Sequence, residues 1–144
     1  MTKPIVGSGR KPKHQKEADL MREIQLEAAK YGCKLLRNNV GVGWVGEHQF
    51  FGGRMMITNP RPLHAGLGTG TSDLIGFTKK RTENGCVAVF TAIEVKTANG
   101  RLTLEQSDFL QAVKADGGLA VCAHSVEDAL TVIKEATGWI SDSE

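Results

Sequence analysis

The sequence predicts a single α/β domain in which a mixed sheet carries helices on both faces. Residues 86–96 form an apolar, β-branched run of the kind found in buried strands. An apolar stripe with helical spacing precedes this run, and two segments with helix-capping signals follow it, beginning at Thr103 and Ser125. Strand-like and helix-like segments thus alternate within 144 residues, which indicates one layered domain around one core.

The first expected element is a helix over residues 17–31, ended by Gly32. Its apolar stripe consists of Leu20, Met21, Ile24, Ala28 and Tyr31. At about 100° per residue, Glu17 falls near the middle of this stripe, Glu27 at its edge and Glu23 further out. An acid in the first turn favours the helix dipole, which explains Glu17 structurally. The other interpretation is a carboxylate that faces a functional site.

A short strand is expected at residues 33–38, followed by a long segment without clear periodicity at 40–70. Within that segment, residues 49–57 are predicted to form a hairpin that turns at Gly52 and Gly53. Long irregular insertions in small domains are usually functional, so the segment is expected to contact a partner or substrate.

A second hairpin is expected from the apolar runs at 74–77 and 86–96, joined by a polar turn at 79–85. Asp73 comes directly before the first run, and Glu94 lies near the end of the second. The hairpin would therefore return one carboxylate to the other.

Side chains alternate along a strand, so Glu94 and Lys96 are expected on one face and Val95 on the other. With Asp73, two carboxylates and one ammonium group would converge. Magnesium binds hard oxygen ligands such as carboxylates, and a nearby lysine can hold or deprotonate an attacking water or neutralise charge on phosphorus. Repulsion between the two acids should raise the pKa of at least one.

The remaining elements are a helix at 103–115, a strand at 119–123 and a last helix from Ser125 to Gly138. Thr103 and Gln106 have the spacing of a capping box, which is a full structural explanation for the glutamine. The same helix start would abut the end of the 86–96 strand, so the amide of Gln106 is also a candidate for the site.

Three motifs stand in order along this part of the chain: Gly-Thr-Ser-Asp-Leu-Ile at 70–75, Glu-Val-Lys at 94–96 and Arg-Leu-Thr-Leu-Glu-Gln at 101–106. They resemble the VRR-NUC branch of the PD-(D/E)XK nuclease superfamily, over roughly residues 17–124. The resemblance implies a restriction-endonuclease-like core and a metal-dependent endonuclease that hydrolyses DNA. It also implies a stand-alone protein of the phage type.

The resemblance also implies roles for individual residues. The residues implied in catalysis are Glu17, Asp73, Glu94, Lys96 and Gln106. The ligands implied for Mg²⁺ or Mn²⁺ are the carboxylates of Asp73 and Glu94 and the carbonyl of Val95. The family has a Glu-x-x-Leu pattern in its first helix, which residues 17–20 match, so Glu17 is placed ahead of Glu23 and Glu27.

Contacts to DNA are expected from basic side chains in three regions. Residues 1–16 carry five of the 18 basic residues and no acid, and they are expected to form a flexible basic arm before the domain at 17–144. Such an arm either binds phosphate or only aids solubility. The candidate DNA-binding residues are Lys11, Lys13, Arg37, Arg54 and Arg61.

No apolar run approaches the roughly 20 residues of a membrane helix, so a cytoplasmic protein without membrane contact is expected. The three cysteines lack metal-ligand spacing and are expected to be buried thiols. The substrates implied by the resemblance include Holliday-junction and flap DNA, and a junction resolvase would need a homodimer. The alternatives are a non-catalytic nucleic-acid-binding module and a structural protein whose charged residues form surface salt bridges.

Overall fold

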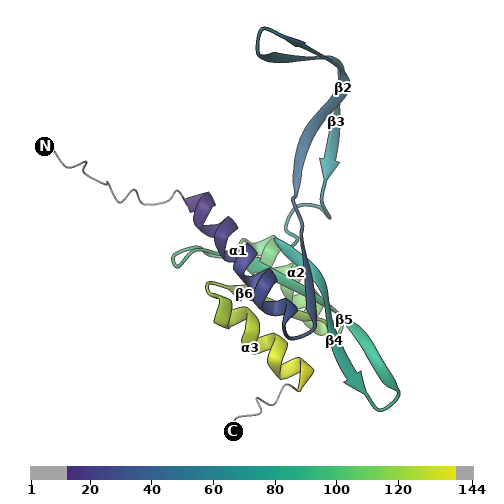
Figure 1. Cartoon of the computed structure of the whole chain (residues 1–144), viewed down its shortest axis with the longest axis vertical. Coiled ribbons are helices and arrows are strands. Elements are labelled where there is room, and N and C mark those ends of the chain that lie inside the picture. Colours follow the sequence, from purple (N-terminus) through teal and green to yellow (C-terminus); the bar gives the residue numbers. More distant parts are fainter. Residues whose placement is uncertain (1–12, 139–144) are drawn as a thin grey trace, which may run out of the picture.

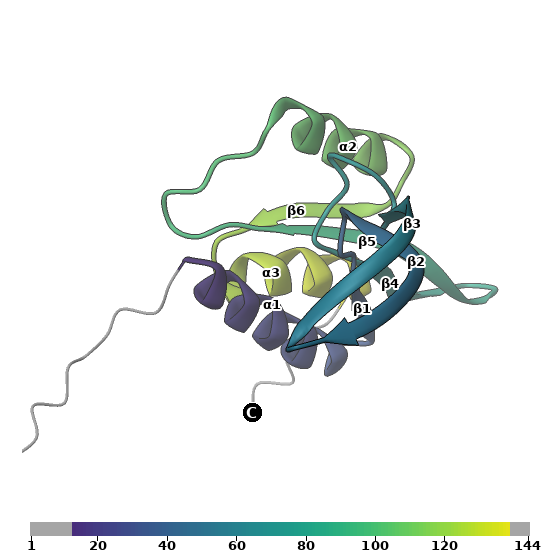
Figure 2. The ribbon, with the colours of Figure 1, turned by 90° about the horizontal axis from the view of Figure 1, so that it is seen from above.

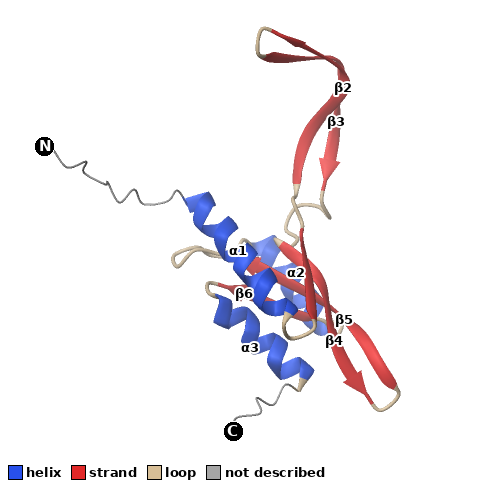
Figure 3. Cartoon of the chain, in the orientation of Figure 1, coloured by secondary structure: helices blue, strands red, loops and turns tan. Residues whose placement is uncertain are grey.

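The computed structural model describes residues 13–138, which form a layered body and a long projecting arm (Figure 1). The elements, in chain order, are α1 (Lys13–Ala29), β1 (Cys33–Arg37), β2 (Gly41–Phe51), β3 (Arg54–Ala65), β4 (Leu74–Thr82), β5 (Gly85–Val95), α2 (Leu104–Ala115), β6 (Leu119–Ala123) and α3 (Val126–Thr137). Four strands and the three helices make up the body, while β2 and β3 alone make up the arm (Figure 3).

The body sheet has the strand order β1-β4-β5-β6. Its first two pairings are antiparallel and the pairing of β5 with β6 is parallel, so the sheet is mixed. Helices α1 and α3 cover one face of the sheet, and α2 lies on the other (Figure 2). The predicted α/β fold with helices on both faces, restriction-endonuclease-like in class, is confirmed.

The core of the body has two layers because alternate strand residues face opposite helices. The larger cluster lies under α1 and α3 and comprises Ile24, Ala28, Cys33, Leu35, Leu74, Ile93, Val95, Ala123, Ala129 and Ile133. The smaller cluster lies under α2 and comprises Ala92, Leu110 and Ala120. A single short helix therefore packs on the second face, and it reaches only β5 and β6.

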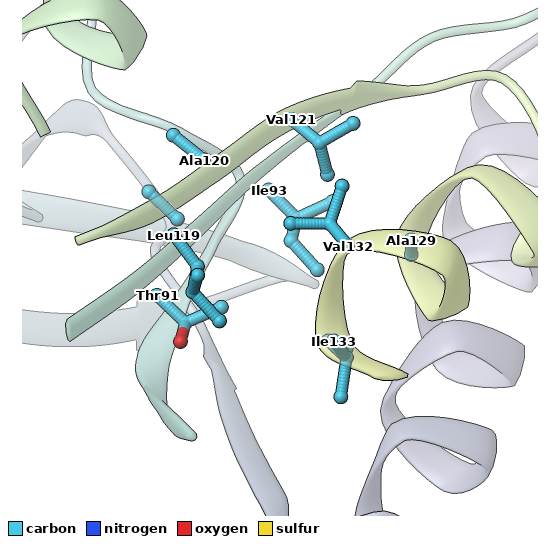
Figure 4. A pocket seen from close by; sticks show the side chains of 9 residues that line it. Thr91, Ile93, Leu119, Ala120, Val121, Ala129, Val132 and Ile133 are labelled. Carbon is cyan, nitrogen blue, oxygen red and sulfur yellow. The ribbon is translucent and has the colours of Figure 1, made fainter. Parts of the chain in front are cut away.

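A small depression lies where α3 packs against β5 and β6, and Figure 4 shows the side chains that line it. Its walls are aliphatic except for Thr91, whose hydroxyl lies 2.7 Å from that of Thr78 and 3.0 Å from the Val89 carbonyl oxygen. No charged side chain borders it, so this depression belongs to the core packing and offers no group for chemistry.

The first helix begins at Lys13, four residues before the predicted start at Glu17. Residues 13–16, which the sequence analysis places in the basic arm, are therefore the first residues of this helix. Lys, Gln and Lys are good helix formers, and Pro12 in the sequence directly precedes the helix, where proline is compatible with a helix start. The rest of the predicted basic arm lies outside the described residues.

The segment predicted to be irregular is instead a regular hairpin of 11- and 12-residue strands. The turn at Gly52 and Gly53 is confirmed, but the strands extend far beyond the predicted 49–57. A register shift between Val45 and Glu47 bends the hairpin, as Figure 1 shows. Gly46 permits this bulge, because a Cβ there would lie 2.5 Å from the Thr58 carbonyl oxygen.

The β4–β5 hairpin is also longer than predicted, since β4 continues to Thr82 and only residues 83–84 form the turn. The cysteine prediction holds for Cys33, which is buried, but is wrong for Cys86, which is exposed in the projecting part of this hairpin. None of the helices in the described residues combines the length and apolar character that crossing a membrane requires.

Candidate nuclease site

The β4–β5 hairpin brings Asp73 to Glu94, as the sequence predicts. Leu74 pairs with Ile93, so the residues that flank this pair lie opposite one another at one end of the sheet. The Asp73 N–H donates to Glu94 Oε2 at 3.3 Å, and the Val95 N–H donates to Asp73 Oδ2 at 2.9 Å. Each carboxylate is thus bonded to the backbone of the strand that carries the other.

Glu94 is the most deeply placed acid of the site, with only 1% of the residue exposed. Its Oε1 accepts hydrogen bonds from Gln106 Nε2 at 2.6 Å and from Lys96 Nζ at 2.8 Å. Burial raises the pKa of Glu94, and the charge of Asp73 adds to this rise, while the contact with Lys96 opposes it. The expected pKa rise in one of the two acids is therefore confirmed, although burial is its largest cause.

Lys96 lies on the same face as Glu94 and is partly buried, as predicted from the alternation of side chains. Burial alone would lower the pKa of Lys96, but the hydrogen bond and charge of Glu94 outweigh it, and the net pKa is raised. The charge of Asp73 contributes in the same direction. The ammonium group is therefore charged, in contact with Glu94 and close enough to Asp73 to feel its charge.

Gln106 both caps α2 and contacts the site, the two roles that the sequence left open. Its backbone N–H donates to Thr103 Oγ1 at 3.2 Å, and its side-chain Oε1 accepts from the Thr103 N–H at 3.0 Å, which completes a capping box. The opposite end of the same amide donates to Glu94. The start of α2 therefore orients one carboxylate of the site.

The loop that carries Asp73 is held by Asn38, which directly follows β1. Its N–H donates to the Asp73 carbonyl at 2.8 Å, and its Nδ2 donates to the Ser72 carbonyl at 3.0 Å. Its Oδ1 accepts from the Leu67 N–H at 3.0 Å. Asn38 therefore positions Asp73, which no sequence spacing indicated because the two residues are 35 positions apart.

Close packing at the same loop explains one of its glycines. Gly70 has a φ of +85°, and a Cβ there would lie 2.6 Å from the Cβ of Glu105 at the start of α2. Next to this contact, the buried hydroxyl of Ser72 has no hydrogen-bond partner among the described atoms. The loop thus packs directly against the helix start that carries Gln106.

Of the three candidate acids in α1, Glu17 is the one whose charge acts on the site. It is partly buried, and its charge contributes to the raised pKa of Lys96. Glu23 is exposed, and Glu27 forms an ion pair with Lys30 at 2.7 Å.

The basic residues predicted to bind DNA are spread over the molecule. Arg37 ends β1 and is in register with Leu74, so it lies at the same end of the sheet as Asp73. Arg54 and Arg61 are exposed on the arm, at its tip and near its middle. Lys11 lies outside the described residues, and Lys13 starts α1 without a described side chain.

The site offers two carboxylates to a cation. Among residues 13–138, no group of three or more His, Cys, Asp or Glu side chains has the arrangement of a metal site. Magnesium needs only one or two protein carboxylates, since carbonyls, waters and substrate phosphate complete its shell. Glu94 Oε1 is occupied by two donors, whereas Oε2 has only the long bond to the Asp73 N–H. The donor set of Asp73, Glu94 and the Val95 carbonyl therefore fits a hard divalent cation.

Residues 62–127 match the family model of the VRR-NUC domain. The match runs from the end of β3 to the start of α3, so it contains Asp73, Glu94, Lys96 and Gln106. It leaves out α1 with Glu17, and most of the arm. A comparison with curated proteins found no match.

Proposed function

Since residues 62–127 are a VRR-NUC domain, a domain of the nuclease class, we propose that this chain is a Mg²⁺- or Mn²⁺-dependent endonuclease that hydrolyses DNA phosphodiester bonds. The observation that carries this proposal is the cluster of two acids and a lysine at the strand end. The Asp73 N–H donates to Glu94 Oε2, the Val95 N–H donates to Asp73 Oδ2, and Lys96 Nζ lies 2.8 Å from Glu94 Oε1. A surface salt bridge would not need a buried glutamate beside a second carboxylate, because that arrangement costs desolvation and repulsion.

Asp73, Glu94 and the carbonyl of Val95 are the groups that would hold the cation. When bound, a divalent cation polarises the scissile phosphate and lowers the pKa of its bound water. The hydrogen bond from Val95 N–H to Asp73 Oδ2 aims the aspartate at the strand end, so the donor set is assembled before substrate arrives.

Lys96 is the cationic group that the chain itself supplies. Its Nζ lies at the strand end beside both acids, where it can donate to a non-bridging oxygen of a bound phosphate or hold the attacking water. A charge-assisted hydrogen bond to the oxygen that gains charge stabilises the transition state more than the ground state. Lys96 therefore acts as an electrostatic and positioning group in this proposal.

Gln106 and Glu17 support these groups from two helices. Gln106 Nε2 fixes Glu94 Oε1, which leaves Oε2 directed toward Asp73. Glu17, in α1, adds a third negative charge within range of Lys96, and this favours the protonated lysine. In this proposal both residues position the groups that meet the phosphate.

DNA would approach the sheet end where Arg37 lies, and the basic side chains would contact its phosphates. Arg54 and Arg61 on the arm, together with Lys11 and Lys13 near the N-terminus, would extend this contact beyond the cleaved bond. Phosphate contacts of this kind add affinity without base specificity and weaken as salt rises.

The substrates that we propose are branched DNA molecules, either Holliday junctions or flaps. A junction presents two equivalent strands for cleavage, so two sites must act together and a homodimer is the natural arrangement. A flap needs one cut, for which a monomer suffices. The oligomeric state of the active protein therefore discriminates between the two substrates.

The test is incubation of the purified protein with plasmid, four-way-junction and flap DNA, with Mg²⁺, with Mn²⁺ and with a chelator. We expect metal-dependent cleavage that Asp73→Asn abolishes, while Asp108→Asn, an exposed acid on α2, leaves it unchanged. Binding of all three DNA molecules without cleavage under any metal condition would instead support the non-catalytic binding module.

A further inference from the structure

One face of the arm carries aliphatic and aromatic side chains and two histidines, and no Asp, Glu, Lys or Arg. Residues directly opposite in the β2–β3 ladder share a face, and the pairs Val42–His64, Trp44–Pro62, His48–Ile57 and Phe50–Met55 lie on one of them by alternation. None of these eight residues is acidic or carries a permanent positive charge. We call this surface the apolar arm face.

The opposite face of the arm holds all the Asp, Glu, Lys and Arg side chains of the two strands, which are Glu47, Arg54 and Arg61, together with apolar residues such as Phe51, Met56 and Leu63. Glu47 pairs with Thr58, Phe51 with Arg54, and Val45 with Arg61, in the alternate register. Charges are thus segregated to one face, which is the pattern of a ribbon that buries its other face.

The arm has no buried side chain of its own. Only Gly46 and Ile57 are partly covered, and the rest of both strands is exposed. An isolated two-stranded hairpin is at best marginally stable in water, and its two free edges invite pairing. A hairpin of this length with Trp44 and Phe50 in solvent therefore needs a partner surface.

The body has an apolar surface without a cover. Helix α2 packs over Ala92 and Ala120, and the part of the sheet beside it, on β1, β4 and the adjoining end of β5, has no helix on this face. The apolar side chains that this part presents are Leu36, Ile75, Phe77 and Phe90, and the exposed Lys34 and Lys79 flank Phe77 on the same face. Leu36, Phe77 and Phe90 are exposed. We call this surface the open sheet face.

We propose that the apolar arm face of one copy covers the open sheet face of a second copy, so that the chain forms a homodimer by reciprocal exchange of arms. The arm stands away from its own sheet, as Figure 1 shows, so the two surfaces do not meet within one chain. A twofold axis pairs each arm with the other body and closes the assembly at two copies.

The chemistry and size of the two surfaces suit each other. Both are mainly aromatic and aliphatic and neither carries an acid, although the arm face includes two histidines and the sheet face two lysines. The bend at Val45–Glu47 lets the arm curve around a neighbour. Trp44 and Phe50 can each bury roughly 150–250 Å². Since the contact occurs twice, it can reach the ~1,600 Å² of a standard stable interface. DNA is the poorer occupant of this face, because phosphate binding needs cations that the face lacks.

This inference specifies how the dimer of the proposed function forms, but it does not depend on catalysis. The experiment therefore uses the full chain without DNA or metal and measures mass by sedimentation equilibrium in the micromolar range. A protein that does not dimerise would contradict this inference but not the proposed nuclease activity. A protein that does not cleave DNA would contradict the nuclease activity but not this inference.

The chain offers a matched pair of variants at the arm tip. Phe50 is 74% exposed on the apolar arm face, and its neighbour Phe51 is 75% exposed on the charged face. Phe50→Glu is expected to weaken dimerisation at least tenfold, and Phe51→Glu to change it less than threefold. Equal effects of the two substitutions, or a wild-type monomer throughout the concentration range, would overturn the proposal.

A second matched pair tests the body surface. Leu36 is 68% exposed on the open sheet face, and Leu26 is 62% exposed on α1, on the other side of the sheet. Leu36→Glu should weaken the dimer as Phe50→Glu does, and Leu26→Glu should not. Circular dichroism and melting temperature must show that all four variants fold, which their high exposure favours.

Mixing the two disrupted variants tests the exchange itself. A heterodimer of Phe50→Glu with Leu36→Glu retains one intact contact, between the normal arm of the second variant and the normal sheet face of the first. The mixture should therefore associate more strongly than either variant alone. No gain on mixing would rule out exchange and favour an arm-to-arm contact, and loss of DNA binding in Phe50→Glu with an intact dimer would make the arm tip a DNA wedge.

Discussion

The body and the arm are built from similar apolar residues but bury them to opposite extents. In β5, the five residues from Thr91 to Val95 are all buried, because helices lie on both sides of them. In β2 and β3 no residue reaches that state, although the strands are as long. Strand length and hydrophobicity thus do not distinguish a core strand from a projecting one; the presence of a covering layer does.

Because of this difference, we expect the body to determine the stability of the chain and the arm to determine its association. The body holds the layers, both helix caps and the acids of the site, so substitutions there should affect folding or cleavage. The arm leads into the Asp73 loop through residues 66–72, so a partner that holds the arm also steadies the chain entering the site. Substitutions in the arm should affect association.

The largest contrast is expected from one substitution type made in both regions. Ile133→Ala removes a side chain that is 1% exposed in the body core and should lower the free energy of unfolding by about 2–5 kcal/mol. Ile57→Ala in the arm should cost less than about 1 kcal/mol, because little is packed around it. Urea unfolding of the two variants at a concentration where the protein is monomeric makes this comparison. Equal losses would mean that the arm contributes to the fold as the body does.

Within the body, Lys96→Ala should act on cleavage far more than on folding. Loss of one charge-assisted contact to a transition state costs about 2.7–4 kcal/mol, or ~100- to 1000-fold in rate. The variant should still fold, because Gln106 continues to donate to Glu94. The control is Lys80→Ala, an exposed lysine on the projecting part of β4. Plasmid nicking and melting temperature are measured together, and unchanged nicking by Lys96→Ala would remove it from the mechanism.

A smaller effect is expected at the two capping boxes of the body. Thr103→Ala and Ser125→Ala each remove an N-cap and should cost about 0.5–2 kcal/mol of stability. Only the first should also slow cleavage, because the α2 start carries Gln106 to Glu94. Thermal melting and nicking assays give both readouts. Equal cleavage by the two variants would show that Gln106 is a structural cap without influence on the site.

The smallest expected effect is the response of the α3 cap to acid. Hydrogen bonds from the His124 and Ser125 N–H groups to Asp128 lower the pKa of this carboxyl from its ordinary value of 3.8. Because the folded-state pKa is depressed, the carboxylate stabilises the fold above the ordinary value, and this contribution is lost as the pH falls through the folded-state value. Asp128→Asn should therefore lower the melting temperature near neutral pH and flatten its decline below about pH 4. A parallel decline in both proteins would contradict this assignment.

Much of the body follows from local signals in the sequence. The β-branched run of β5 and the alternation along it placed Glu94 and Lys96 on one face, and the short polar turn returned Asp73 to them. The spacing of Thr103 and Gln106 predicted the capping box that the structure contains. These features depend on contacts between residues close in sequence or joined by one turn, so the pattern of residue types was enough.

Only the tertiary structure showed the contacts between residues that are far apart in the sequence. Burial of Glu94, and with it the direction of its pKa shift, depends on α2 and the Asp73 loop closing over the strand end. Asn38 holds that loop across 35 positions, a contact no local spacing could indicate. The extent of the arm was also missed, because the glycines and prolines within its two strands are typical of turns and loops. The sequence by itself determined the elements of the body and the order of the site residues along the chain. Which strands are covered by helices, as β5 is, and which stay in solvent, as β2 and β3 do, was decided only by packing, because burial is a property of the whole fold.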